Sequence, residues 1–148
     1  MANCKIKPKD PHILGNKQGR IEGNFLYIPS EFFLYVSEYV VERIMREQYQ
    51  ALAVFPKYIW IKEVSVLPEE EKNIRESRTS GIESIIREND KSIFELDECS
   101  LSHIGESTNS VMLCGYLSHF EVYRIDSFRK LMRKSFKEDI SDFEALLV

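Results

Sequence analysis

The chain has 148 residues, a length typical of one domain. Of these, 43% are hydrophobic, 11% aromatic and 30% charged, which is enough apolar material for a packed core. The 20 basic and 24 acidic residues give a net charge of -4, which excludes a globally basic nucleic-acid coat protein. No apolar run of signal-peptide or membrane-span length occurs, so we expect a cytoplasmic protein with no membrane partner.

The N-terminal segment differs from the rest of the chain. Residues 1–19 are basic and contain two prolines and two glycines, which disfavour regular structure. We therefore expect a flexible basic arm over residues 1–19 and a single α+β domain over residues 20–148. Residues 20–28, which end before Pro29, predict a strand with a possible bulge at Gly23.

A long central helix is predicted over residues 30–50. Ser30 can cap its N-terminus, and apolar residues then recur at the three-or-four spacing of a buried helical face. Residues 51–55 form a short apolar run that ends at Pro56. Residues 57–67, rich in β-branched and aromatic residues, predict the strongest strand of the chain.

The strand predicted over residues 57–67 changes phase halfway. Ile59 and Ile61 would share one face, whereas Val64 and Val66 would lie on the other. Either both faces are covered, or a bulge shifts the register. The following residues, 68–80, are highly charged and predict an exposed loop or a frayed helix.

The second half of the chain predicts shorter elements. We expect a short helix at 82–89, a strand at 92–96, a loop with one helical turn at 97–110, and a hairpin of strands at 111–117 and 120–125. A last helix follows, capped by Asp126 or Ser127, with Phe128, Leu131, Met132 and Phe136 on its apolar side. The predicted fold is α+β: a mostly antiparallel, mixed sheet packed by the long central helix and the C-terminal helix.

Two thiols and two imidazoles raise the hypothesis of a zinc site. Cys99, His103, Cys114 and His119 have the ligand types of a tetrahedral site, but not the spacing of a standard zinc finger. Whether the four residues converge stays open, and we assign no metal and no cofactor. The three cysteines form no CxxC pair, so reduced thiols are expected, and no neighbouring base marks one of them as a nucleophile.

Two segments resemble motifs of the acetyl-CoA-dependent N-acetyltransferase superfamily: VSVLPE at residues 64–69 and RTSGIE at residues 78–83. The resemblance implies a strand followed by a turn that opens a helix, where backbone N–H groups hold the pyrophosphate of the cofactor. It also implies Tyr116 or Tyr123 as the proton donor to the departing thiolate. Glu83 departs from the pattern, because the family has a small residue there.

Charged residues are separated along the chain. Residues 62–98 are predominantly acidic, whereas residues 120–137 are basic. Such separation favours a charged partner, although solvated helix faces and loops produce the same pattern. The basic patch consists of Arg129, Lys130, Arg133, Lys134 and Lys137.

No catalytic residue is assigned, and we predict a small non-enzymatic protein that binds another protein. In the manner of an inhibitor, immunity protein or antitoxin, it would occlude a basic partner such as a toxin or nuclease. Two alternatives stay open: a divergent acetyl-CoA-dependent transferase, and a nucleic-acid-binding protein that uses the basic patch and the N-terminal arm. The predicted partner-binding residues are Glu69, Glu70, Glu71, Glu95, Asp97 and Glu98.

Overall fold

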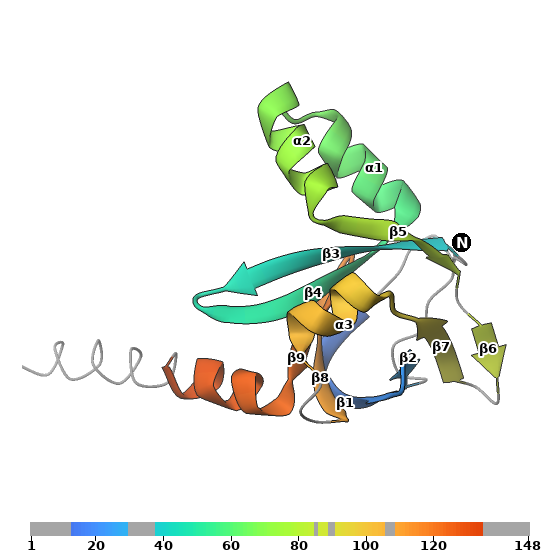
Figure 1. Cartoon of the computed structure of the whole chain (residues 1–148), viewed down its shortest axis with the longest axis vertical. Coiled ribbons are helices and arrows are strands. Elements are labelled where there is room, and N and C mark those ends of the chain that lie inside the picture. The colour runs from blue at the N-terminus through green and yellow to red at the C-terminus, as the bar shows by residue number, and fades with distance from the viewer. Residues whose placement is uncertain (1–12, 30–37, 85, 89–90, 106–108, 135–148) are drawn as a thin grey trace, which may run out of the picture.

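The computed structural model is built on a curled antiparallel sheet and describes residues 13–29, 38–84, 86–88, 91–105 and 109–134 (Figure 1). Within these residues the strand order is β5-β3-β4-β9-β8-β1-β2-β7-β6. The strands are β1 (Ile13–Glu22), β2 (Phe25–Ile28), β3 (Glu38–Arg46), β4 (Tyr49–Pro56), β5 (Thr79–Ser84), β6 (Ile86–Glu88), β7 (Lys91–Glu95), β8 (Ser110–Leu117) and β9 (Phe120–Arg124). The helices are α1 (Lys57–Ser65), α2 (Glu69–Ser77), α3 (Glu98–Ile104) and a helix over residues 125–134. The predicted α+β class with an antiparallel sheet is confirmed.

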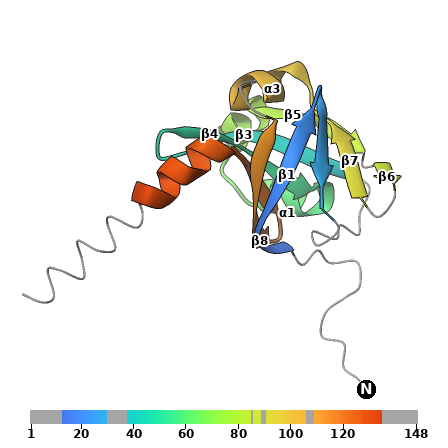
Figure 2. The same cartoon turned by 90° about the horizontal axis from the view of Figure 1, so that it is seen from below.

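The inner face of the sheet carries the main hydrophobic core. Side chains alternate between faces along each strand, so the paired positions Val54 and Phe120, and likewise Leu113 and Val122, point inward together. Leu101 of α3 packs against this core. As Figure 2 shows, α3 and the helix over residues 125–134 occupy different sides of the sheet.

The opposite side, which we call the outer face, has a smaller apolar cluster. Ala51, Cys114 and Tyr123 form its buried centre, and Phe128 and Leu131 of the helix over residues 125–134 pack against it. This confirms the predicted C-terminal helix with Phe128 and Leu131 on its apolar side. Met132, predicted on the same side, is instead 48% exposed, and Phe136 lies outside the described residues. The remainder of the outer face carries the polar residues described below.

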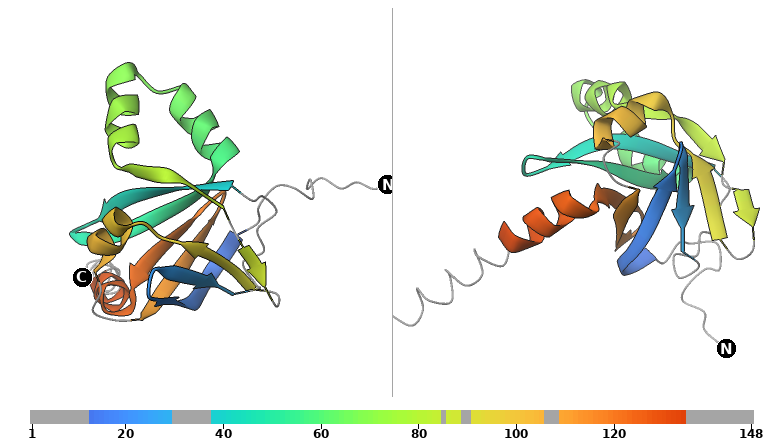
Figure 3. Two further views of the ribbon diagram at one scale, coloured as in Figure 1. Left: turned by 45° about the vertical axis from the view of Figure 1, so that its right-hand side comes forward. Right: turned by 60° about the horizontal axis from the view of Figure 1, so that its bottom comes forward.

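Helices α1 and α2 form a helical hairpin (residues 57–77) between β4 and β5. The hairpin projects from the sheet in both Figure 1 and Figure 3. Val64 is the buried residue of α1, whereas no residue of α2 is buried. Polar contacts at its base therefore carry much of its attachment to the sheet.

The prediction of a helix over residues 30–50 is wrong for residues 38–50, the part of this range that the structure describes. Residues 38–46 form β3, and β4 begins at Tyr49, with Val40 paired with Phe55 and Ile44 with Ala51. Strand β3 is buried on both faces between Tyr39 and Glu42, so its continuous apolar run also satisfies helical spacing. Residues 30–37 lie outside the described part.

The strand predicted over residues 57–67 is also wrong, because residues 57–65 form α1. Helical spacing explains the change of phase: Trp60, Glu63 and Val64 are three or four positions apart and share one helical face. Residues 68–80 were predicted as an exposed loop or frayed helix, and residues 69–77 form the exposed helix α2. The helix predicted over residues 82–89 is wrong, since the described residues there belong to β5 and β6.

Several shorter elements lie where they were predicted. Strand β7, helix α3 and the β8–β9 hairpin agree with the predicted strand at 92–96, helical turn within 97–110 and hairpin. Residues 13–19, expected in the flexible arm, instead belong to β1 and pair with β8. Gly23 lies in the β1–β2 turn with a φ of 62°, a conformation that glycine adopts without strain. None of the described helices is both long and apolar enough to cross a bilayer.

Candidate functional site

Two buried glutamates mark the outer face of the sheet. Glu42 on β3 pairs with Ala53 on β4, and Ala53 pairs with Glu121 on β9. Directly paired residues of antiparallel strands point to the same face, so both carboxylates flank Ala53 at backbone positions about 10 Å apart. Glu42 is only 2% exposed and Glu121 is 0% exposed. A buried carboxylate needs charged or hydrogen-bonding partners, and both have them.

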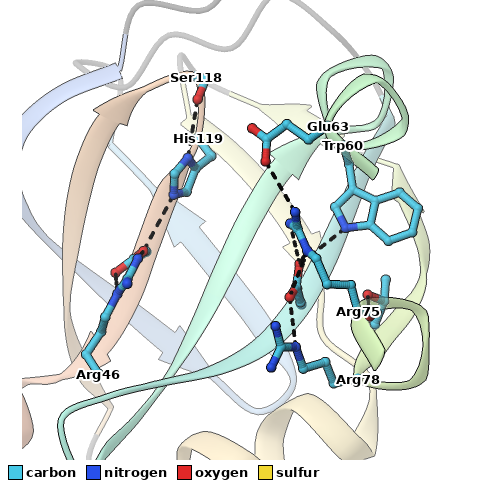
Figure 4. Close-up of polar contacts among 10 residues, drawn as sticks. Arg46, Trp60, Glu63, Arg75, Arg78, Ser118 and His119 are labelled. Atoms are coloured by element: carbon cyan, nitrogen blue, oxygen red, sulfur yellow. Dashed lines mark hydrogen bonds and ion pairs between the residues drawn. The ribbon is translucent and has the colours of Figure 1, made fainter. Parts of the chain in front are cut away.

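The carboxylate of Glu42 is bound from the helical hairpin. Arg75 donates from Nη2 at 2.8 Å, Arg78 donates from Nε at 2.9 Å, and the indole N–H of Trp60 donates at 3.3 Å. Arg75 also donates to Glu63 at 3.4 Å (Figure 4). Glu42 therefore joins both helices of the hairpin to β3.

The carboxylate of Glu121 is bound from within the sheet. Arg46 reaches from β3 and donates through both Nε and Nη2, and the Tyr123 hydroxyl donates at 2.7 Å. His119 Nε2 lies 3.5 Å from the carboxylate. Burial alone would raise the pKa of Glu121, but the hydrogen bonds from these three side chains outweigh it and lower the pKa to about 2. Glu121 is therefore ionised at neutral pH.

The imidazole of His119 is held by stacking as well as by polar contacts. Its ring lies 4.3 Å from the ring of Phe55 and 5.3 Å from that of Tyr116, nearly parallel to both. Its Nδ1 lies 3.3 Å from the Ser118 hydroxyl (Figure 4). A serine, a histidine and a carboxylate in this order can activate a hydroxyl, but a hydrolase also needs N–H donors for the oxyanion. In the β8–β9 turn, the backbone amides of Tyr116 and Ser118 donate to backbone carbonyls, so these two N–H groups are not available to bind an oxyanion.

A groove of about 380 Å³ lies between the two carboxylate clusters. Ala53 and Phe55 contribute to its floor, and Ile44 and Met45 contribute apolar wall. Both carboxylates are engaged by arginines of the same chain, so the groove presents guanidinium groups at its surface. This arrangement suits binding better than proton transfer. The charged and imidazole lining consists of Glu42, Arg46, Glu63, Arg75, Arg78, His119 and Glu121.

The six acidic residues predicted to bind a partner fall into two groups. Glu69, Glu70 and Glu71 are exposed in the first turn of α2, at the tip of the helical hairpin. The other three lie on the body of the molecule, between the end of β7 and the start of α3. The structure therefore does not place the six acids on one continuous surface.

The three acids on the body differ in role. Glu95 accepts a hydrogen bond from the side chain of Asn24, and Glu98 is exposed. Asp97 is the N-cap of α3 and accepts from the Ser100 amide at 2.9 Å and the Ser80 hydroxyl at 3.0 Å. Burial opposes ionisation of Asp97, but these hydrogen bonds outweigh it and lower its pKa. Its role is to cap the helix.

The basic patch is exposed on the helix over residues 125–134. Lys134 contacts Glu47 of the β3–β4 turn at 3.0 Å, and Arg129 lies 4.0 Å from Asp126. The helical hairpin and this helix lie at opposite ends of the molecule (Figures 1 and 3). Lys137 lies outside the described residues. The described members of the patch are Arg129, Lys130, Arg133 and Lys134.

The four residues of the zinc hypothesis do not converge. Cys99 is exposed on α3, and His103 contacts the backbone oxygen of Ile44 through Nε2 at 2.8 Å. Cys114 is buried on β8, where desolvation and the nearby Glu121 raise its pKa to about 12. Within the described part of the chain, no cluster of three or more histidine, cysteine, aspartate or glutamate residues is arranged to hold a metal.

The segments that resemble acetyltransferase motifs do not form the implied structure. The first spans the end of α1 and the start of α2, where the resemblance implies a strand. The second leads into β5, so Gly81 lies within a strand and opens no helix. The expected cradle of backbone N–H groups is therefore absent at this described segment. Tyr123 donates its hydroxyl to Glu121, and burial raises its pKa.

The principal residues of the groove were missed by sequence reasoning. Glu42 and Glu121 were available as a signal, because each is a single acid within an apolar run, VVERI and HFEVY. An acid at such a position is paired when it is buried. Its partners come from other elements, so the sequence does not reveal which arginines they are. No family model matches the chain, and a search of curated proteins found no match either.

Proposed function

We propose that the protein binds another protein through the helical hairpin and acts by covering a basic surface of that partner. The observation that carries the proposal is the hairpin itself, which projects from the sheet (Figure 1). It also leaves several large apolar side chains exposed. Exposed apolar side chains on a projecting element are typical of interaction sites. The exposed residues are Tyr58, Ile61, Val66 and Ile74.

The charge of the hairpin tip indicates the chemistry of the partner. Glu69, Glu70 and Glu71 lie in the first turn of α2, shortly after Val66 in the chain, and Glu71 lines a pocket together with Ile74. An apolar centre with a charged rim is the usual composition of a protein interface, and the rim charges steer association. The partner that fits is a protein with an apolar cleft surrounded by lysine or arginine. Glu95, Asp97 and Glu98 are left out of this surface, because they lie on the body of the molecule.

Occlusion of the inhibitor, immunity-protein or antitoxin kind is the mechanism we propose. A projecting helical hairpin can enter a cleft that a flat sheet face cannot reach.

The test compares matched surface variants. Purified wild-type protein, Ile61→Asp and Met132→Asp are used as baits in extract of the native cell, because Ile61 and Met132 are 49% and 48% exposed on separate helices. We expect one basic protein to bind wild type and Met132→Asp but not Ile61→Asp. With that partner purified, reversing the charges of Glu69, Glu70 and Glu71 should slow association and weaken its salt dependence. Equal capture by all three baits, or unchanged association kinetics, contradicts the proposal.

A second candidate, nucleic-acid binding, is favoured by the helix over residues 125–134. Its four described cations lie on exposed positions while Phe128 and Leu131 pack on the sheet, so the exposed side of the helix is predominantly basic, with Asp126 as its one described acid. Such a face can contact phosphates, and its affinity then falls steeply with salt. The test is DNA and RNA binding by wild type and by a variant with Arg129 and Lys130 changed to Gln. Binding that is salt-independent, or unchanged in the variant, contradicts this candidate.

A further inference from the structure

We propose that the groove between Arg46 and Arg78 is a binding site for a small oxyanion, a phosphate ester or a carboxylate. The groove lies where the base of the helical hairpin meets the sheet, and none of the exposed apolar residues of the hairpin lines it. The proposal therefore stands independently of the partner-binding function. It rests on the orientation of two arginines, on the charge state of the groove and on its dimensions.

The two arginines are oriented in advance. Arg78 uses Nε to bind Glu42, and its terminal nitrogens point from the hairpin side toward β4 (Figure 4). Arg46 extends from β3 across β4 and uses Nε and Nη2 to bind Glu121 on β9. Both side chains are about half exposed. A guanidinium fixed along one edge by a carboxylate loses little freedom when its remaining N–H groups bind an anion.

The charges of the groove favour an anion over a cation. A cation would need free carboxylate oxygens, but Glu42 and Glu121 are already bound by Arg75, Arg78 and Arg46. Glu63, the third carboxylate of the lining, lies 3.4 Å from Arg75. Between the two buried carboxylates, the remaining N–H groups of Arg46 and Arg78 are therefore the donors that face a ligand. Guanidinium N–H groups match the oxygens of phosphate and carboxylate in geometry, and such charged hydrogen bonds are strong.

The dimensions of the groove indicate a small organic anion. Its volume of about 380 Å³ lies within the range of small-molecule sites. The small side chain of Ala53, between the two carboxylate clusters, leaves room above β4. Phe55, Ile44 and Met45 can contact an apolar part of the ligand, and the His119 ring closes one end.

The test is a titration of the full chain with inorganic phosphate and, separately, with succinate, at an ionic strength held constant with sodium chloride. Calorimetry gives the affinity, and the arginine Nε–H signals in NMR spectra identify the side chains involved. We expect saturable binding of at least one anion and shifts at Arg46 and Arg78. The stronger of the two ligands distinguishes the phosphate class from the carboxylate class.

The variants are matched for charge and exposure. Arg78→Gln should weaken binding about tenfold, and Arg78→Lys should weaken it less, because lysine keeps the charge but loses the two-pronged contact. Arg20→Gln is the control, since the side chains of Arg20 and Arg78 are 47% and 46% exposed. Glu42 keeps Arg75 and Trp60 as partners in the Arg78 variants, which preserves the fold. Absence of binding above chloride, or equal loss in Arg78→Gln and Arg20→Gln, overturns the proposal.

Discussion

Glu121 shows how one buried charge can make stability depend on pH. Its pKa is lowered from 4.5 to about 2, so the folded state binds a proton less readily than the unfolded state does. The stabilisation is complete above pH 4.5 and is lost as the pH falls toward about 2. We predict that the free energy of unfolding of the wild-type protein decreases across this window, as measured by urea unfolding at a series of pH values.

The variant that isolates this contribution is Glu121→Gln. The amide keeps the shape of the side chain but cannot pair with Arg46 as a charge, so it should lower stability at pH 7 by about 1–3 kcal/mol. Its stability should also decline less than that of wild type between pH 4.5 and 2. Exposed Glu98→Gln is the control and should keep the wild-type decline. A decline in Glu121→Gln as steep as in wild type would show that Glu121 is not responsible.

At the scale of single elements, Glu42 is the main side-chain attachment of the helical hairpin to the sheet. Glu42 binds Trp60, Arg75 and Arg78, whereas no residue of α2 is buried and Val64 is the buried residue of α1. Removing one partner of a buried ion pair leaves the other charges without compensation. We predict that Glu42→Ala lowers the free energy of unfolding by about 3 kcal/mol. It should also raise amide hydrogen exchange in α1 and α2 far more than in β8 and β9.

A matched control for the hairpin is Glu63→Gln. Glu63 makes a single contact of 3.4 Å with Arg75 and is partly exposed, so its loss should cost less than about 1 kcal/mol. Mass spectrometry measures the amide hydrogen-exchange rates of each element in both variants. Uniform acceleration throughout the sheet in Glu42→Ala would mean that the hairpin is not an independently attached element.

How far the sequence predicts each element depends on local signals as well as on burial. The helix over residues 125–134 has one apolar face, and a polar turn at Ser118 and His119 marks the β8–β9 hairpin, so both were predicted although β9 is buried on both faces. Strand β3 is buried on two faces, and its turn to β4 consists of Glu47 and Gln48 without the usual glycine or asparagine. Helix α1 is rich in residues with strand propensity, but Trp60 and Val64 contact the sheet at helical spacing. Tertiary contacts, rather than local propensity, therefore determine the secondary structure of both β3 and α1.

The candidate site was less predictable than the fold because it, too, depends on tertiary contacts. Each of its carboxylates is bound by side chains from other elements, up to 75 positions away in the case of Arg46 and Glu121. Sequence spacing carries no information about such a pairing. The row of Glu42, Ala53 and Glu121 becomes recognisable only when the register of β3, β4 and β9 is known.

At the scale of the whole molecule, the two faces of the sheet are covered in different ways. The inner face is filled by a large apolar core, whereas the apolar part of the outer face is covered by the helix over residues 125–134. That cover consists of Phe128 and Leu131 over Ala51, Cys114 and Tyr123. The stability of the outer face therefore depends on the docking of one helix.

Cys114 can report whether this helix is docked. It is buried and its pKa is raised to about 12, so it should resist alkylation at neutral pH, whereas exposed Cys99 should react. Phe128→Ala removes part of the cover, and we predict that it increases the alkylation rate of Cys114 at least about tenfold. Met132→Ala, a half-exposed position on the same helix, should leave the rate unchanged. Peptide mapping after timed iodoacetamide labelling assigns each adduct, and rapid labelling of Cys114 in the wild-type protein would show that the helix does not cover the outer face.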